Sequence, residues 1–166
     1  MIIEFNKEHS GIKSPTRANP SDAGLDIYAD LMEPVVIEHG TNAVVPTGLR
    51  FGVPHGYMLQ VCNRSSMGAK KSLVVGAHII DSGYDGEVFI DLHNIGRESQ
   101  TVNPGDKIAQ VVMVPVVSFR VSEVDDRESL YGRPITISNR GDGALGSTDK
   151  KKKQIVSTAD LDMRDE

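Results

Sequence analysis

The sequence has a single cysteine, Cys62, no tryptophan and an aromatic content of only 5%. One cysteine excludes an internal disulfide framework and is typical of a reducing compartment. No apolar run approaches the roughly 20 residues that a membrane-spanning helix needs. The first residues, MIIEFNKEH, contain neither an apolar core nor a cationic leader. We therefore expect a cytoplasmic protein with no membrane partner.

An excess of basic charge is also missing, because 18 Lys and Arg face 23 Asp and Glu and give a net charge of −5. This balance lacks the basic footprint of a protein that binds nucleic acid, so we expect no such partner. A protein of this charge that handles anions must gather its cations locally. The length of 166 residues fits one folded domain.

Short segments rich in Val and Ile, each bounded by Gly, Pro, Asn or Asp, dominate the first two thirds of the chain. Such segments are typical of strands between turns, and their spacing favours a barrel or a two-sheet jelly roll. The only helix that the sequence indicates covers residues 65–71, where serines precede Met67 and Ala69. The strands are expected at residues 35–37, 43–51, 57–62, 87–92 and 108–117.

From Val121 onward the sequence becomes charged and irregular, and after about Ser138 it has too few apolar residues to build a core. We therefore expect a β domain over residues 1–138, with an irregular insert at about 121–138. Residues 139–166 are expected to form a mobile C-terminal tail. The lysines at 150–153 are interpreted as a solvated part of that tail, because nearby acids offset them.

Five short stretches combine glycine with polar side chains. Taken singly, each is weak, because an aspartate beside a glycine is more often a turn residue than a catalytic one. Their order along the chain is more specific. The stretches are Ala23-Gly-Leu-Asp26, Arg64-Ser-Ser-Met-Gly68, Ile80-Asp-Ser-Gly-Tyr-Asp-Gly-Glu87, Gly105-Asp-Lys-Ile-Ala-Gln110 and Arg140-Gly-Asp-Gly-Ala-Leu-Gly-Ser-Thr148.

In this order the five stretches resemble the signature motifs of the trimeric deoxyuridine triphosphatase (dUTPase) family, over about residues 15–148. The resemblance implies an all-β fold, a distorted jelly-roll subunit of the β-clip type. It also implies a homotrimer whose three active sites lie between subunits and are closed by the flexible tail. The implied reaction splits dUTP into dUMP and pyrophosphate, which limits uracil in DNA and supplies dUMP for dTMP synthesis. The location would be the cytoplasm of the cell, or of a host cell for a phage or viral member.

The resemblance implies two sets of phosphate ligands. Arg64, Ser65 and Ser66 precede a helix start, where a guanidinium, hydroxyls and N–H groups can hold phosphate oxygens. Gln110 matches a further phosphate-contacting amide, although a polar residue at a strand end is the ordinary interpretation. The tail would clamp the β- and γ-phosphates through Arg140, Gly146, Ser147 and Thr148, while Leu145 would cover the base.

Asp81 is the residue expected to be catalytic, because the matching aspartate of the family orients the water that attacks the α-phosphate. Tyr84 is expected to pack against the sugar and to leave no room for a 2′-hydroxyl. The backbone around Gly76, His78 and Ile80 would pair with the uracil edge as a hairpin. The resemblance also implies Mg²⁺, held mainly by the substrate phosphates, with Asp26 in its outer shell.

Four features depart from the family pattern. Leu145 stands where an aromatic residue usually stacks on uracil, Val75 stands in place of an Asn near the base, and Gly83 replaces a second aspartate. The connection between Gln110 and Arg140 is longer than usual, with residues 130–139 as the apparent insert.

Residues 75–84 also resemble the related dCTP deaminases, including the Ala-His pair at His78, so a deaminase or a bifunctional enzyme is an alternative. Two positions argue against it. Asp91 stands where the deaminase has a glutamate as proton shuttle, and an acid shorter by one methylene misplaces the proton. Ala69 stands where the deaminase has an arginine. A third hypothesis is a nucleotide-responsive regulatory protein whose tail signals to a partner.

Overall fold

The computed structural model describes residues 2–131, which divide into one part that ends at Phe119 and a second that begins at Arg120. The first part is almost entirely β-structure, so the prediction of an all-β fold is confirmed. Its one α-helix is α1 (Ser65–Lys71). The strands are β1 (Glu4–Lys7), β2 (Leu25–Tyr28), β3 (Val35–Ile37), β4 (Asn42–Pro46), β5 (Leu49–Gly52), β6 (Tyr57–Cys62), β7 (Leu73–Val75), β8 (Ile79–Ile80), β9 (Phe89–Asn94), β10 (Gln100–Val102) and β11 (Lys107–Pro115).

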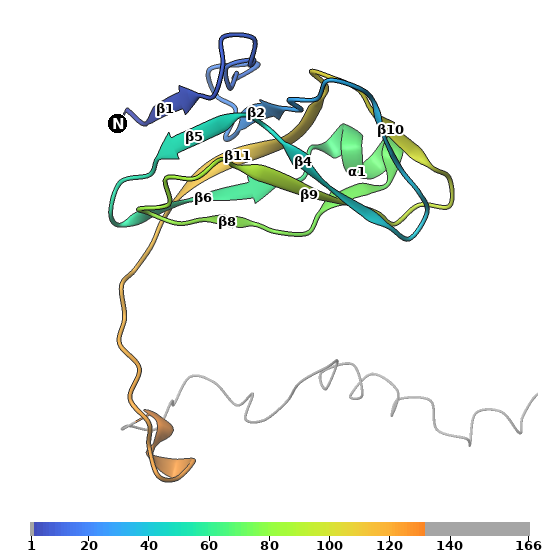
Figure 1. Ribbon diagram of the computed structural model, residues 1–166. Helices are drawn as coiled ribbons and strands as arrows, with labels where there is room; N and C mark the ends of the chain where they lie inside the picture. Colours follow the sequence, from blue (N-terminus) through green and yellow to red (C-terminus); the bar gives the residue numbers. More distant parts are fainter. Residues whose placement is uncertain (1, 132–166) are drawn as a thin grey trace, which may run out of the picture. The chain divides into compact units, whose positions relative to one another are not determined.

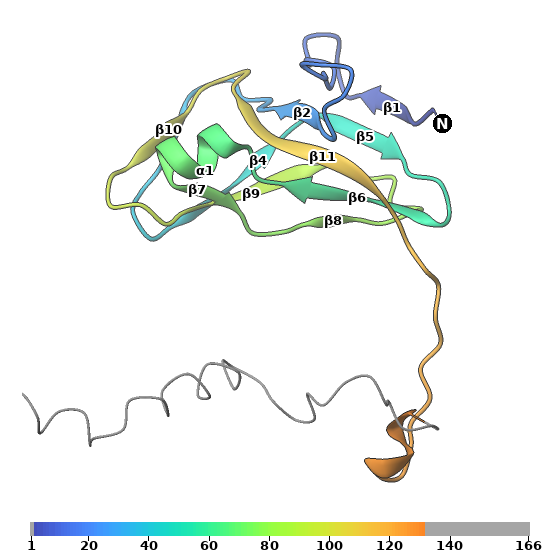
Figure 2. The same ribbon diagram turned by 180° about the vertical axis from the view of Figure 1, so that it is seen from behind.

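The strands form four small antiparallel sheets (Figure 1). The largest has the order β2-β11-β6-β8, and the next has the order β4-β9-β7. Two further pairs, β1-β5 and β10-β3, complete the set. Seen from both sides, α1 lies beside β7 and β10 (Figures 1 and 2), and Lys71 Nζ of α1 donates to Thr101 O of β10 at 3.0 Å.

Alternation along the strands sends one set of side chains into a common core. In β9, for example, Ile90, Leu92 and Asn94 are buried, while the residues between them point outward. The buried Asn94 amide donates to Ile37 O and Glu98 O, both at 2.8 Å, and accepts from Gly96 N at 2.9 Å. A polar group at this depth is tolerated because its hydrogen bonds are made.

The strands predicted at residues 35–37 and 57–62 and the helix at 65–71 have the predicted bounds. The single strand predicted over residues 43–51 is wrong, because Thr47 and Gly48 separate β4 from β5. Gly48 has a φ of 64°, a conformation that an extended strand cannot contain. Buried Thr47 Oγ1 fixes the bend by donating to Val88 O at 2.6 Å and accepting from Leu49 N at 3.2 Å.

In the second part, the described residues contain only one short 3₁₀-helix, Glu128–Tyr131. The irregular insert expected at about 121–138 lies only partly within the described residues and stays a prediction. The predicted boundary near residue 138 and the tail at 139–166 lie outside the described residues and stay predictions. No helix within residues 2–131 is both long and apolar enough to cross a membrane.

Gly48→Ala tests the bend between β4 and β5. A Cβ at this position would collide with Ile12 Cδ1 and would lie 2.8 Å from Asp30 Oδ2. We expect a loss of about 2–4 kcal/mol in the free energy of unfolding, from the left-handed backbone and the overpacking together. The control is Gly40→Ala, because Gly40 has a φ of 73° but no neighbour within 4 Å. Its loss should be about 1 kcal/mol, and equal losses by urea unfolding would contradict the collision.

Candidate functional site

Register in the largest sheet brings three of the sequence motifs together. Gln110 of β11 pairs with Asp26 of β2 on one side and with Cys62 of β6 on the other. Asn63 and Arg64 follow Cys62 directly, and α1 begins at Ser65. Residues that are more than 80 positions apart in the chain therefore meet on three neighbouring strands, β2, β11 and β6, beside the start of α1.

The carboxylate of Asp26 lies at the centre of this group of residues and is almost completely buried. Arg64 Nε donates to Asp26 Oδ1 at 2.8 Å, and Lys107 Nζ donates to Asp26 Oδ2 at 2.7 Å. Burial raises the pKa of Asp26, but the hydrogen bonds and charges of Lys107 and Arg64 outweigh it and hold the pKa below its ordinary value. Asp26 also raises the pKa of Lys107 through the same hydrogen bond.

Arg64 is oriented by further contacts. Its Nη1 donates to Ser66 Oγ at 3.2 Å and to Lys107 O at 3.4 Å. The guanidinium therefore faces an open pocket of about 180 Å³ at the start of α1. The residues that line this pocket are Ala18, Asp22, Gly24, Asp26, Arg64, Ser65 and Gln110.

Gln110 reaches the pocket across a glycine. A Cβ at Gly24 would lie 2.6 Å from Gln110 Oε1, so a larger residue at position 24 would displace the amide. Gln110 Nε2 donates to Asn63 O at 2.9 Å, which fixes the side chain beside Arg64. Asn63 in turn accepts the backbone N–H of Val75 on its Oδ1 at 2.7 Å.

Asp81 and Tyr84 line a different pocket, of about 250 Å³, together with Ile79, Ile80, Glu87, Val88 and Phe89. The Asp81 carboxylate makes no hydrogen bond to any residue within 2–131, so it is open to a ligand. The turn is closed by Tyr84 N, which donates to Asp81 O at 3.3 Å. Gly83 has a φ of 85° there, which accounts for glycine in place of the family's usual aspartate.

The loop that holds Tyr84 is anchored at several points. Tyr84 Oη donates to Glu87 O at 2.7 Å, and its ring occupies the space that a Cβ at Gly86 would need. Glu87 Oε1 accepts the N–H of Gly48 at 2.8 Å, and Arg50 Nη1 donates to Asp85 O at 2.7 Å. The tyrosine ring is thus held in a fixed, half-exposed position.

The segment 76–80, expected to read a base as a hairpin, joins two sheets instead. The strands beside it do not pair with each other, since β7 pairs with β9 and β8 pairs with β6. Residues 76–79 are exposed, and the N–H and C=O of Ala77 have no hydrogen-bond partner within the described chain. The side chains of Val75 and Ile80 are buried, which leaves only their backbones for a ligand.

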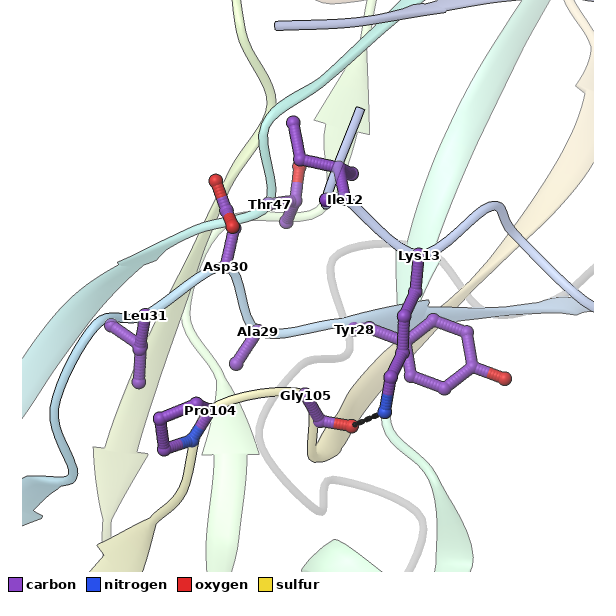
Figure 3. A pocket seen from close by; sticks show the side chains of 10 residues that line it. Ile12, Lys13, Tyr28, Ala29, Asp30, Leu31, Thr47, Pro104 and Gly105 are labelled. Carbon is purple, nitrogen blue, oxygen red and sulfur yellow. Dashed lines mark hydrogen bonds between the residues drawn. The ribbon is translucent and has the colours of Figure 1, made fainter. Parts of the chain in front are cut away.

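A third pocket, of about 250 Å³, has none of the predicted site residues in its lining (Figure 3). It is lined in part by Lys13, Asp30 and Gly105. Lys13 Nζ donates to Gly105 O at 2.9 Å and lies 5.2 Å from the centroid of the Tyr28 ring. Asp30 accepts from His9 Nε2 at 3.1 Å.

The structure therefore gathers Asp26, Arg64, Ser65 and Gln110 at one pocket and Asp81, Ile80 and Tyr84 at another. Gly76 and His78 lie on the connecting segment. The predicted contacts of Arg140, Leu145, Gly146, Ser147 and Thr148 fall outside the described residues. Sequence reasoning missed the roles of Lys107 and Asn63. Lys107 stood within a recognised motif, whereas nothing local marked Asn63, which acts through contacts with other strands.

The oxygen and nitrogen side chains of the described residues indicate which metal ion the site could hold. Within residues 2–131, no three His, Cys, Asp or Glu side chains gather in a way that would enclose an ion. Asp22 and Asp26 line the pocket that contains Arg64, so carboxylate oxygens are present beside a set of anion-binding groups. Such a site fits Mg²⁺ that keeps its waters and is held mainly by phosphates.

An all-β fold with arginine, hydroxyl and amide groups gathered at one pocket defines a protein of the jelly-roll class with a candidate anion-binding site. Residues 10–148 match the model of the dUTPase family, and the chain belongs to this family.

Curated relatives cover nearly the same range. A deoxyuridine 5'-triphosphate nucleotidohydrolase of Chlamydia muridarum is 36% identical over 146 residues, which cover 87% of this chain and 96% of that protein. The protein of the same name from Paraburkholderia xenovorans is 40% identical over 139 residues, which cover 82% and 88%.

Solved structures agree with the fold. A dUTPase mutant from Staphylococcus bacteriophage 80alpha, solved with dUpNHpp, superposes with a TM-score of 0.71 at 26% identity and covers 89% of this chain and 98% of its own. A dUTPase mutant from phage phi11 of S. aureus superposes with a TM-score of 0.69 at 26% identity and covers 78% and 100%. That structure concerns the coordination of a structural Mg(II) ion.

Asp26→Asn tests the ion pairs at the sheet edge. We expect the free energy of unfolding at pH 7 to fall by about 1–3 kcal/mol, because two cations lose a charged acceptor. The folded pKa of Asp26 is lowered, so its contribution is present above the unfolded pKa of about 4 and is lost as the pH falls through the folded value. Urea unfolding at matched protein concentration should show the variant and the original chain converging as the pH falls through the lowered folded pKa of Asp26. A constant gap would contradict this account.

Proposed function

We propose that this member of the dUTPase family hydrolyses dUTP to dUMP and pyrophosphate by attack of water on the α-phosphate. The observation that carries the proposal is the meeting of Arg64, Ser65 and Gln110 at one pocket. The open carboxylate of Asp81 beside Tyr84 supplies the second half of the chemistry.

The first pocket is the phosphate side. Arg64 supplies a charged donor, the hydroxyls of Ser65 and Ser66 supply neutral donors, and the Gln110 amide adds another. Asp26 and Lys107 hold Arg64 in place before substrate arrives, so little reorganisation is needed on binding. The tail residues Arg140 and 146–148 complete this side by holding the β- and γ-phosphates.

The second pocket supplies the nucleophile. Water bound to the Asp81 carboxylate is oriented toward the α-phosphorus and gives up a proton to that carboxylate. A bond forms between the water oxygen and phosphorus, and the bond from phosphorus to the pyrophosphate oxygen breaks. Positioning of this kind supplies much of the catalysis in phosphoryl transfer.

Selection of the substrate follows from two features. The held ring of Tyr84 presents a flat apolar surface to the sugar, which leaves no space for a 2′-hydroxyl. The unpaired backbone groups of Ala77 in the segment 76–80 bind the uracil edge. Leu145 covers the base less specifically than an aromatic residue would.

The proposed cofactor is Mg²⁺, with Asp26 in its outer shell. When bound, it neutralises negative charge on the triphosphate. The residues of this chain keep their own roles, since Arg64 orients the phosphates and Asp81 holds the water.

The two pockets share no lining residue, which supports a site completed between copies of the chain. The second pocket also carries the exposed apolar side chains of Ile79 and Phe89, which suit burial against a partner copy. We therefore propose a homotrimer in which neighbouring subunits bring the phosphate side and the water side together.

The alternative of dCTP deamination is disfavoured by the surroundings of Asp91. Its Oδ1 accepts from Asn42 Nδ2 at 2.8 Å, and its Oδ2 lies 2.9 Å from His93 Nε2. With both oxygens engaged, this carboxylate is poorly placed to shuttle protons. Ala69 on α1 offers no charge in place of the deaminase's arginine.

Incubation with dUTP and, separately, with dCTP in the presence of Mg²⁺ tests the reaction. We expect pyrophosphate and dUMP from dUTP, no ammonia from dCTP, and loss of turnover after chelation by EDTA. Ammonia from dCTP would instead support the deaminase. Tight binding of dUTP without turnover would support the regulatory hypothesis.

Asp81→Asn tests the water-orienting role. We expect nucleotide affinity to be kept and kcat to fall by about 10²–10⁴-fold, because the water loses its proton acceptor. The matched control is Asp85→Asn, an exposed aspartate in the same loop, which should stay near the original activity. Equal kcat values for the original chain and Asp81→Asn would remove Asp81 from the mechanism.

A further inference from the structure

A polar cluster on the outward face of β9 has no part in the mechanism described so far. Asp91 and His93 are two positions apart on this strand and both side chains are partly exposed. The Asp91 carboxylate lies between Asn42 Nδ2 of β4 and His93 Nε2. The hydrogen bond from Asn42 lowers the pKa of Asp91 most, and although burial opposes it, the bond to His93 adds to the lowering.

The side chains of Asp91 and His93 pack directly against the backbone of Gly76. A Cβ at this position would collide with both Asp91 Oδ2 and His93 Nε2. The φ of Gly76 is outside the left-handed region, so backbone conformation does not require glycine here. Glycine is required because the side chains of Asp91 and His93 leave no room for a Cβ. Gly76 N also donates to Asp91 O at 2.8 Å, one residue beyond the last pair of the β7–β9 ladder.

The other end of the same segment is tied to the second sheet. Val61 N donates to His78 O at 2.8 Å, and His78 Nδ1 lies 2.9 Å from Val61 O. The neighbours of Ala77 are therefore hydrogen-bonded, Gly76 to β9 and His78 to β6. The N–H and C=O of Ala77 itself have no partner within the described residues. Any movement of Gly76 changes where these two groups point.

We propose that Asp91, held by Asn42 and His93, is a positioning residue that fixes the backbone of Gly76 and Ala77 for binding the base. This inference rests on the proposed function, because it concerns the segment that binds uracil there. It gives the carboxylate at position 91 a role although both of its oxygens are engaged. Asp91 acts through the backbone and does not touch the reacting atoms.

Steady-state kinetics of Asp91→Ala test the inference. We expect KM for dUTP to rise about tenfold with kcat within about twofold, because base binding weakens while the phosphate and water groups stay in place. The preference for dUTP over dCTP, measured as the ratio of kcat/KM values, should fall as well. Loss of folding would lower kcat or active protein, not this ratio. Asn42→Ala removes one support of Asp91 and should give the same pattern more weakly.

The chain offers a matched control in the His9–Asp30 pair, another aspartate–histidine contact, at 3.1 Å. Asp30 lines the pocket of Figure 3, and no residue of the segment 76–80 lines that pocket. Asp30→Ala should leave KM, kcat and the dUTP preference unchanged. An equal rise in KM in Asp30→Ala would overturn the inference.

A double-mutant cycle gives the sharpest readout. Gly76→Ala should raise KM strongly in the original chain but much less in the Asp91→Ala/His93→Ala background, since the side chains that its Cβ meets are gone. Additive effects, or an unchanged KM in Asp91→Ala, would overturn the inference while dUTP hydrolysis by the original chain stood.

If the original chain binds dUTP without hydrolysing it, the proposed reaction fails separately. Calorimetry then replaces kinetics, and a tenfold weaker Kd for Asp91→Ala would still support the positioning role. An equal Kd, or no binding of dUTP by the original chain, would overturn it.

Discussion

The pairing of Asp26 with Arg64 and Lys107 is the interaction on which the site depends. It joins β2, β11 and the residue before α1 around one nearly buried carboxylate. Without the two cations that carboxylate would be costly to bury, and without the carboxylate the two cations would repel each other. The same pairing aims Arg64 into the pocket where Ser65 and Gln110 lie. Arg64 therefore belongs both to the ion pairs that hold the fold and to the pocket proposed to bind phosphate.

Much of the fold could be predicted from the sequence, because short Val- and Ile-rich segments between turn residues define strands locally. The helix at 65–71 was predicted because serine is a favoured N-cap, but the structure places Arg64 at the N-cap, with no side-chain capping bond. The bend at Gly48 was not, because it depends on Thr47 bonding to Val88, a contact between distant segments. The shortest strands, such as β8 and β10, carry too little periodicity to stand out.

The candidate site likewise contains features that the sequence predicted and features that depend on contacts between distant segments. The resemblance of the motifs to the family predicted Asp26, Arg64, Ser65 and Gln110 as site residues, and the sheet register with the start of α1 brings these four to one pocket. Asp91 had no explanation in the sequence, because its partners come from distant segments: Asn42 from β4 and Gly76 from the residue after β7. The expected hairpin at 76–80 is a bridge between two sheets, a property of topology that a linear motif cannot express.

In the proposed enzyme, each chain carries two separate halves of a site, and a neighbouring copy completes each of them. The most direct test is co-assembly of two inactive variants, Arg64→Ala and Asp81→Asn, carried on differently tagged chains and purified as mixed oligomers. If phosphate and water groups come from different copies, about one site in three of each mixed trimer contains both intact groups, and dUTP hydrolysis returns to that level. If mixed oligomers form and remain as inactive as either variant alone, the divided site is contradicted.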